Sequence, residues 1–231
     1  MRRRVSRGAR PSAAPGVRPP HRRAVREGQD RAQNALRVID ISRPIGEETE
    51  PWEGDVPFSW RATARLVEGS LFESTCFTMS SHLGTHVDAP SHVLPAGRAI
   101  GDVSLNAFLG PARVVDLPGR GEIGPDALPP RSVGVRRVLF RTRGRAFLAP
   151  LAAVRLAERG TILVGTDARS IDPDDAEDLP VHRTLLSRGV MVLENLNLEG
   201  VEPGDYGLVA LPLAFRELDA SPVRAILIKT E

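Results

Sequence analysis

The chain has 231 residues, of which 41% are hydrophobic and 26% charged, so it is long enough to bury one sizeable core. No apolar run approaches the length of a membrane helix, and the N-terminus lacks the apolar segment of a secretory signal. Cys76 is the only cysteine, so an internal disulfide is excluded. These features predict a cytoplasmic protein that does not act at a membrane.

The net charge of +2 is distributed unevenly along the sequence. Residues 1–37 contain eleven Arg against Glu27 and Asp30, which leaves 20 basic and 27 acidic residues in the rest of the chain. The basic charge therefore belongs to a tail and does not indicate a nucleic-acid-binding domain. Residues 1–35 are rich in Arg, Pro, Ala and Gly without apolar periodicity, which predicts a disordered extension. A solvated tail, an over-long translation start and a basic arm for RNA or acidic partners remain alternatives.

Residues 36–231 have the hydrophobic patterns of a single domain with many strands and few helices. Strands are expected at 36–41, 58–67, 71–79, 112–117, 135–141, 161–165, 190–193, 206–211 and 223–228. Helices are expected at 150–159 and 181–187. This pattern predicts an α/β or α+β fold.

Four potential metal ligands lie in a segment of eleven residues: His82, His86, Asp88 and His92. Burying such a cluster without a partner would be costly, which favours a metal site. A zinc-protease helix is excluded because that motif needs a Glu directly after the first His, where this chain has Leu. In a straight strand His82 and His86 would lie about 13 Å apart, too far to share an ion. The chain is therefore expected to bend, and Gly84 is the residue that permits it.

The segment His82-Leu83-Gly84-Thr85-His86-Val87-Asp88-Ala89-Pro90-Ser91-His92 resembles the metal-dependent cyclase-like hydrolases that include bacterial kynurenine formamidase. The similarity continues in Trp52-Glu53-Gly54-Asp55, in Gly165-Thr166-Asp167, in Ser170-Ile171-Asp172-Pro173 and from Leu218 to Ala225. The resemblance implies a strongly curved, mostly β core flanked by a few helices, the swivelling β/β/α-like cyclase fold. It also implies a homodimer or a higher homo-oligomer.

A second family signature, a His followed twelve residues later by a Glu, is met by His182 and Glu194. The resemblance implies two divalent ions, zinc or in some relatives manganese, with Asp88 shared between them. One ion would be held by His82 and His86, and the other by His182 and Glu194. His92 would be the general acid/base for a metal-activated water that hydrolyses an N-formyl aryl amine such as N-formylkynurenine.

Other chemistries remain open because the same site could serve them. The alternatives are a cyclic amide or lactone hydrolase, a cyclase or dehydratase of secondary metabolism, and a metal-binding protein without turnover. The chain also departs from the family pattern at Ala168-Arg169, where a small residue and a proline often precede the serine.

Several further positions have two interpretations. Asp167 is expected either to orient a ligand imidazole or to be a plain turn residue. Thr85 is expected to hydrogen-bond near the ions or to cap the bend. The glycine-rich segment from Gly119 to Gly124 is interpreted as a loop, because the prolines after it exclude the helix of a dinucleotide site. Cys76 is expected to be a packed thiol.

Overall fold

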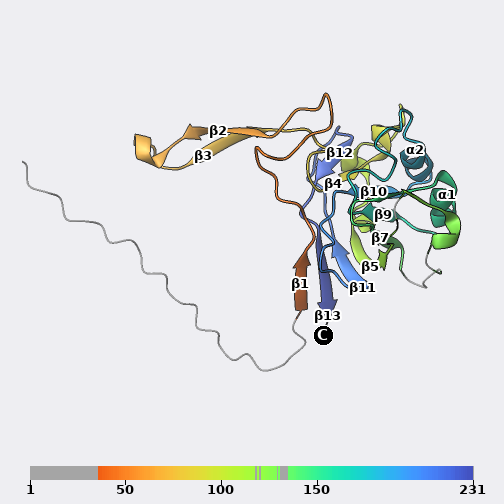
Figure 1. Ribbon diagram of the computed structural model, residues 1–231. Helices are drawn as coiled ribbons and strands as arrows, with labels where there is room; N and C mark the ends of the chain where they lie inside the picture. The colour runs from red at the N-terminus through yellow and green to blue at the C-terminus, as the bar shows by residue number, and fades with distance from the viewer. Residues whose placement is uncertain (1–35, 118, 120, 129, 131–134, 231) are drawn as a thin grey trace, which may run out of the picture. The chain divides into compact units, whose positions relative to one another are not determined.

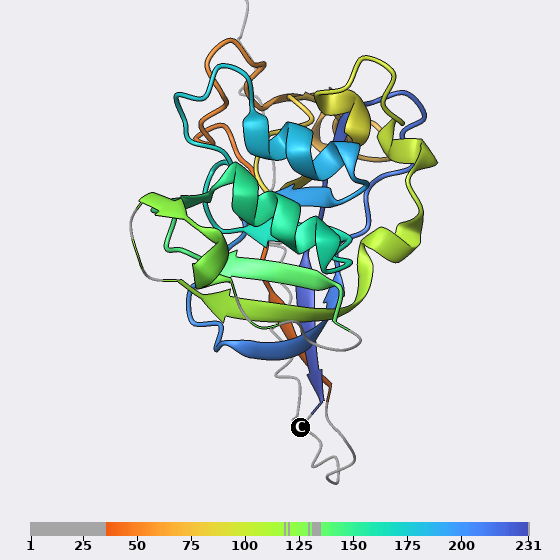
Figure 2. The ribbon, with the colours of Figure 1, turned by 90° about the vertical axis from the view of Figure 1, so that its right-hand side faces the viewer.

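The computed structural model of the chain describes residues 36–117, 119, 121–128, 130 and 135–230 (Figures 1 and 2). The predicted disordered extension, residues 1–35, lies outside this part of the chain. A sheet of nine strands organises the described residues, in the order β1-β13-β11-β5-β7-β9-β10-β4-β12. Its strands are β1 (Leu36–Asp40), β4 (His86–Asp88), β5 (Leu109–Asp116), β7 (Arg137–Arg141), β9 (Leu163–Thr166), β10 (Met191–Glu194), β11 (Gly204–Val209), β12 (Ala220–Pro222) and β13 (Ile226–Thr230).

The centre of the sheet is parallel and its two sides are antiparallel. β5, β7, β9 and β10 run in the same direction, whereas β4 and β12 on one side and β11, β13 and β1 on the other pair antiparallel. All residues of β9 and β10 are buried, which explains why both strands are mostly apolar before their last residues, Thr166 and Glu194. In Figure 2, β13 and β1 run across the direction of β5 and β7, so the sheet is strongly curved.

Two α-helices, α1 (Pro150–Glu158) and α2 (Pro180–Ser187), lie side by side over one face of the sheet (Figure 2). Each begins with a proline at its first position, where the missing N–H costs nothing. Helix α1 buries Ala152, Ala153 and Leu156 against the core. The described residues also form five single-turn 3-10 helices: η1 (Leu66–Glu68), η2 (Pro90–His92), η3 (Ile100–Asp102), η4 (Leu105–Ala107) and η5 (Pro125–Ala127).

A two-stranded hairpin, β2 (Ser59–Ala64) and β3 (Ser74–Thr78), extends away from the main sheet (Figure 1). Its strands pair with each other and with no other described strand. Trp60 is 50% exposed and Phe77 is 61% exposed. The expectation of a packed thiol at Cys76 is wrong, because this residue is exposed on the hairpin.

The interpretation of the glycine-rich segment as a loop is also wrong in part. Gly121–Ile123 forms strand β6, which pairs in parallel with β8 (Ala146–Leu148), and η5 follows it. The strand is stabilised by pairing with β8, which lies in a later part of the chain. The local sequence does not reveal this partner.

The predicted fold is confirmed: the domain has many strands, two α-helices and a curved sheet. Each expected strand and helix overlaps an observed one, with boundaries shifted by a few residues. Among the described residues, no helix is long and apolar enough to cross a membrane.

Candidate metal centre

The histidine-rich segment folds as a sharp bend followed by a short strand. Gly84 adopts φ +71°, a left-handed conformation that glycine reaches without strain. Strand β4 then begins at His86, and η2 ends at His92. The bend brings the ring centroids of His82 and His86 within 5.0 Å of each other. The predicted bend at Gly84 is therefore confirmed.

Strand register places Glu194 beside this segment. β4 pairs antiparallel with β10, and Glu194, the last residue of β10, lies opposite His86. The distance from His86 Nε2 to Glu194 Oε2 is 3.5 Å. Helix α2 contributes His182, whose Nε2 lies 3.2 Å from Glu194 Oε1. Residues from three separate parts of the sequence therefore meet at one end of the parallel strands.

Asp88 lies at the centre of this cluster. Its Oδ1 is 3.0 Å from His82 Nδ1 and 3.4 Å from His86 Nε2. Its Oδ2 is 3.4 Å from His182 Nε2. The two carboxylate oxygens thus face two different groups of donors, as a carboxylate shared by two ions would.

The surroundings of Asp88 are those of a metal ligand. Both of its carboxylate oxygens are buried, and neither accepts a hydrogen bond from any described residue. An uncompensated buried carboxylate is strongly unfavourable, and most buried polar atoms have a partner. Cations at the cluster would supply the missing interaction, so the residues fit the divalent ions that the sequence implies.

Hydrogen bonds orient two of the imidazoles. His86 Nδ1 lies 2.9 Å from the carbonyl oxygen of Gly84, and His182 Nδ1 lies 2.7 Å from Asp172 Oδ2. A carbonyl or carboxylate acceptor at Nδ1 fixes the tautomer, which leaves the Nε2 lone pair free for an ion. In both residues Nε2 is the atom that faces Asp88.

Asp172 also holds the start of helix α2. Its carboxylate accepts hydrogen bonds from the backbone N–H groups of Val181 at 2.8 Å and His182 at 3.0 Å. A carboxylate at a helix N-terminus satisfies free donors and complements the helix dipole. Asp172 therefore fixes both the backbone and the ring of His182.

His92 lies at the edge of the cluster, beside Asp219. Its Nδ1 is 3.3 Å from Asp219 Oδ2, and the same oxygen is 2.9 Å from His82 Nε2. The His92 side chain keeps 22% of its surface exposed, whereas His86 and His182 are buried. The ring is thus accessible to a molecule in the adjoining cavity.

The charges of the cluster favour positive groups next to its carboxylates. Burial opposes protonation of His82, but the hydrogen bond to Asp219 and the nearby negative charge of Asp88 outweigh it and raise the pKa of His82 to about 10. Burial alone would raise the pKa of Glu194, but the charge of His182 lowers it to about 2. The pKa of Asp88 is likewise lowered well below its usual value, despite burial, by His86, His182 and His82. The carboxylates stay ionised and attract positive charge, which divalent ions can provide.

A cavity of about 420 Å³ opens onto the cluster. Its polar lining includes His82, His92, His182, Glu194 and Asp219. Its apolar lining consists of Trp52, Pro173, Ala176 and Leu179. A cavity of this size, with apolar walls and convergent polar groups, is typical of a small-molecule site.

The comparisons with known proteins agree with this geometry. Residues 39–173 match the family model described as "Putative cyclase". A kynurenine formamidase of Bacillus cytotoxicus is 40% identical over 200 residues, which cover 82% of this chain and 96% of the relative. A kynurenine formamidase of Paracidovorax citrulli is 42% identical over 210 residues, which cover 81% of this chain and 94% of the relative. The chain belongs to the cyclase family.

Solved structures confirm the cyclase fold. A structure titled as a potential metal-dependent hydrolase with cyclase activity superimposes with a TM-score of 0.73 and 32% identity, covering 85% of this chain and all of that one. A predicted metal-dependent hydrolase from Bacillus stearothermophilus superimposes with a TM-score of 0.71 and 30% identity, covering 84% of this chain and 98% of that one. An isatin hydrolase superimposes with a TM-score of 0.74 and 19% identity, covering 85% of this chain and 93% of that one. This likeness supports the fold alone.

All six residues predicted for the cyclase-family site come together: His82, His86, Asp88, His92, His182 and Glu194. Their division between two ions stays a prediction. The donor atoms that lie within 4.8 Å of one another form two trios, His82/Asp88/His92 and His86/Asp88/Glu194. Both trios share Asp88, but the first includes His92, which the sequence assigns to proton transfer.

Two residues that sequence reasoning did not single out contact the site: Asp172 and Asp219. Both lie in segments that resemble the family, but no spacing rule connects them to a histidine. Their partners are known only once α2 and the segment before β12 are placed in space.

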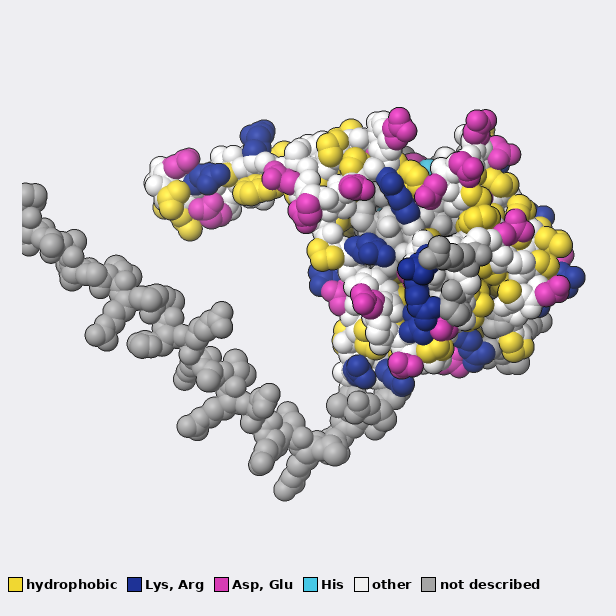
Figure 3. Space-filling view, viewed as in Figure 1, with side chains coloured by type: hydrophobic (Ala, Val, Ile, Leu, Met, Phe, Trp, Pro, Cys, Tyr) yellow, Lys and Arg dark blue, Asp and Glu magenta, His cyan; other side chains and the backbone are white. Residues whose placement is uncertain are grey.

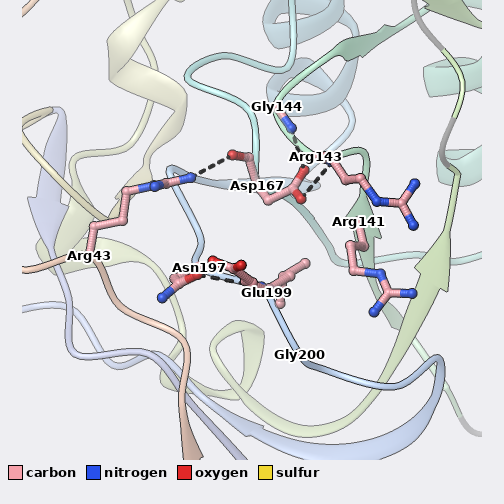
Figure 4. A pocket seen from close by; sticks show the side chains of 9 residues that line it. Arg43, Arg141, Arg143, Gly144, Asp167, Asn197, Glu199 and Gly200 are labelled. Atoms are coloured by element: carbon pink, nitrogen blue, oxygen red, sulfur yellow. Dashed lines mark hydrogen bonds between the residues drawn. The ribbon is translucent and has the colours of Figure 1, made fainter.

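Asp167 does not orient an imidazole. Its carboxylate accepts hydrogen bonds from the N–H and hydroxyl of Thr142 at 2.8 and 2.6 Å. It also accepts one from the N–H of Arg143 at 2.9 Å, so it fixes a turn (Figure 4). It borders a separate cavity of about 500 Å³, lined by Arg43, Arg141 and Arg143 among others. None of the six predicted site residues lines that cavity.

Thr85 connects the bend to neighbouring segments. Its hydroxyl donates to the carbonyl of Asn195 at 2.6 Å and accepts from the N–H of Arg43 at 2.9 Å. Thr85 therefore joins the backbone next to His86 to the backbone next to Glu194, two of the predicted metal ligands.

Proposed function

We propose that this protein is a metal-dependent arylformamidase, which hydrolyses N-formylkynurenine to kynurenine and formate. The observation that carries the metal chemistry is Asp88, a buried carboxylate whose two oxygens face two groups of donors and accept no hydrogen bond from the described residues. The substrate is supported by the identity to kynurenine formamidases, 40% and 42%, over most of the chain.

Two divalent ions would be held by the cluster. His82, His86 and Asp88 Oδ1 would hold one ion, and Asp88 Oδ2, His182 and Glu194 the other. Imidazole and carboxylate ligands suit zinc, which we propose, and also manganese. When bound, the ions would supply Lewis acidity toward water and toward the formyl carbonyl.

His92 would transfer the proton. Asp219 interacts with its Nδ1, which leaves Nε2 to accept a proton from the attacking water. The water oxygen bonds to the formyl carbon, and the C–N bond then breaks. Nε2 returns the proton to the departing aryl amine, so that kynurenine and formic acid form with His92 in its starting state, and the acid then ionises to formate by losing a proton to solvent.

The apolar part of the cavity would bind the aryl ring. Trp52, Leu179 and Pro173 line the same cavity as His92 and Asp219. An aromatic substrate can stack on an indole ring while its polar formamide points to the charged cluster.

We further propose that the protein forms a homodimer through the β2–β3 hairpin. An isolated two-stranded hairpin is only marginally stable in water. Large apolar side chains of this hairpin and its tip are exposed (Figure 3): Trp60, Leu66, Val67, Leu71, Phe72 and Phe77. The alternating sequence of β3 predicts one covered side, but most of its side chains are exposed in the single chain. A second copy of the hairpin offers a matching apolar surface.

The first experiment measures kynurenine release from N-formylkynurenine by purified protein, before and after chelation and after re-addition of zinc or manganese. Turnover that chelation abolishes and metal restores supports the proposal. Metal-loaded protein without turnover contradicts the substrate and directs the assay to cyclic amides, lactones and the substrates of cyclases or dehydratases. Protein that binds no divalent metal contradicts the metal chemistry itself.

A further inference from the structure

The indole ring of Trp52 is held by an arginine from another loop. The guanidinium carbon of Arg169 lies 4.0 Å from the centroid of the Trp52 ring, and its Nη2 donates to the carbonyl of Pro51. The first contact is a cation–π interaction, and the second fixes the backbone next to the ring. Arg169 therefore holds both the Trp52 ring and the backbone of the preceding residue, Pro51.

Arg169 supports the ring from outside the catalytic cavity. Trp52 lines the cavity with His82 and His92, whereas Arg169 does not. Arg169 lines a neighbouring cavity of about 270 Å³ together with Arg145 and Asp172. One surface of the indole is thus available to a molecule near His92, while the arginine holds the ring from the adjoining space.

Regular structure does not position Trp52. The segment between β1 and β2, which contains Trp52, has neither helix nor strand. Side-chain contacts such as the hydrogen bond from Ser80 Oγ to Asp55 Oδ2, at 2.8 Å, attach it to the domain. The place of the ring therefore depends on a few contacts, of which the pair with Arg169 is the most direct.

The loop that carries Arg169 is itself attached to the metal centre. The N–H of Ile171 donates to Glu194 Oε1 at 2.7 Å, and Asp172 contacts His182 Nδ1. The carbonyl of Ala168 accepts from the N–H of Asn195 at 3.1 Å. Arg169 therefore connects Trp52 to the backbone that holds two proposed ligands.

We propose that Arg169 is a positioning residue that fixes Trp52 as a wall of the catalytic cavity and thereby sets the affinity for planar aromatic substrates. The effect on substrate rests on the proposed function, but the effect on the ring does not. Because Arg169 contacts neither the cavity nor a reacting atom, its loss weakens substrate binding more than the chemical step.

Fluorescence tests the position of the ring without substrate. The chain has two tryptophans, so Trp60→Phe leaves Trp52 as the single tryptophan in every variant, and excitation that tryptophan alone absorbs isolates its emission from that of Tyr206. In that background, Arg169→Ala is expected to shift Trp52 emission to the red and to increase its quenching by acrylamide. Arg169→Lys, which keeps the cation, is expected to restore part of the original signal. Arg145→Ala, which removes an equal charge from the same neighbouring cavity, is the control and leaves the signal unchanged.

Kinetics with N-formylkynurenine tests the consequence for substrate. Arg169→Ala is expected to raise KM roughly 2- to 5-fold with kcat nearly unchanged, the size of one cation–π contact. Unchanged emission and quenching in Arg169→Ala would overturn the proposal, as would a loss confined to kcat. If no variant, nor the parent protein, turns over the substrate, the proposed function fails while the fluorescence still decides the role of Arg169.

Discussion

Asp88 is the side chain on which the candidate metal centre depends. It is fully buried, and three imidazoles face its oxygens at 3.0–3.4 Å. Since burial of an unpaired carboxylate is unfavourable, the geometry is most stable with positive charge in the cluster. Asp172 and Asp219 hydrogen-bond to histidines of the cluster, and each holds a histidine in a defined orientation.

Replacing His92 separates proton transfer from metal binding. His92→Asn is expected to lower kcat by about 10²- to 10⁴-fold, the usual contribution of a general acid/base, with the metal content unchanged. Metal content is measured by elemental analysis of the purified variant. His92 also belongs to one trio of candidate ligands, so loss of metal would show instead that it is a ligand. His86→Asn is the comparison variant and is expected to lose metal.

Removing the charge of Asp172 tests the orientation of His182. Asp172→Asn keeps a side-chain acceptor for the start of α2 but weakens the contact with His182 Nδ1. Metal affinity is expected to fall about 10- to 100-fold, as for other residues that orient ligands. Competition with a chelator measures this affinity. Ser104→Ala, which removes the side-chain cap of η4, is a control that should not change it.

At the scale of elements, the short strand β4 determines which residues meet. It pairs with β10 on one side and β12 on the other, so that His86 lies opposite both Glu194 and Pro222. A shift of one residue would turn His86 and Asp88 to the opposite face. The bend at Gly84 and the two neighbouring strands fix this register.

Gly84→Ala should damage both stability and the site. Its φ of +71° is unfavourable for alanine by about 1–2 kcal/mol. A Cβ at this position would also lie 2.7 Å from the side chain of Ile45. Gly160→Ala is a matched control, because Gly160 has φ +81° but open space around it. Chemical denaturation should show both losses of stability, with metal affinity reduced only in Gly84→Ala. Equal metal affinity in the two variants would contradict a role for the bend in the site.

At the scale of the whole molecule, the exposed hairpin is the feature that a single chain does not explain. The apolar side chains of the hairpin are exposed to solvent, whereas the central strands β9 and β10 of the main sheet are buried on both faces. An exposed apolar ribbon of this kind is typical of an association surface. The proposed dimer covers it with a second copy of the same ribbon.

The double variant Phe72→Asp, Phe77→Asp is expected to be monomeric at concentrations where the parent protein is a dimer. Charges on 62% and 61% exposed side chains cost little in the monomer but repel each other across a symmetric interface. Light scattering coupled to size-exclusion chromatography measures the mass. Leu151→Asp places a charge on an equally exposed residue of α1 and should leave the mass unchanged. A monomeric parent protein would contradict the proposed interface.

The sequence by itself determined the family and the strand-rich fold, and it predicted the six residues that come together in the candidate site. It could do so because the ligands of β4 lie close together in the chain, and because His182 and Glu194 keep a fixed spacing across α2 and β10. The bend at Gly84 followed from distance alone. The location in the cytoplasm, the number and identity of the ions, and the role of each site residue stay predictions.

Only the tertiary structure decided which side chains surround these residues. Asp172, Asp219 and Arg169 act on partners that lie far from them in sequence or belong to another loop, and no local pattern encodes such contacts. The role of Asp167 and the strand at Gly121–Ile123 were likewise fixed by non-local hydrogen bonds. Periodicity and motif spacing report short-range order, whereas the pairing of distant segments depends on the packing of the whole sheet.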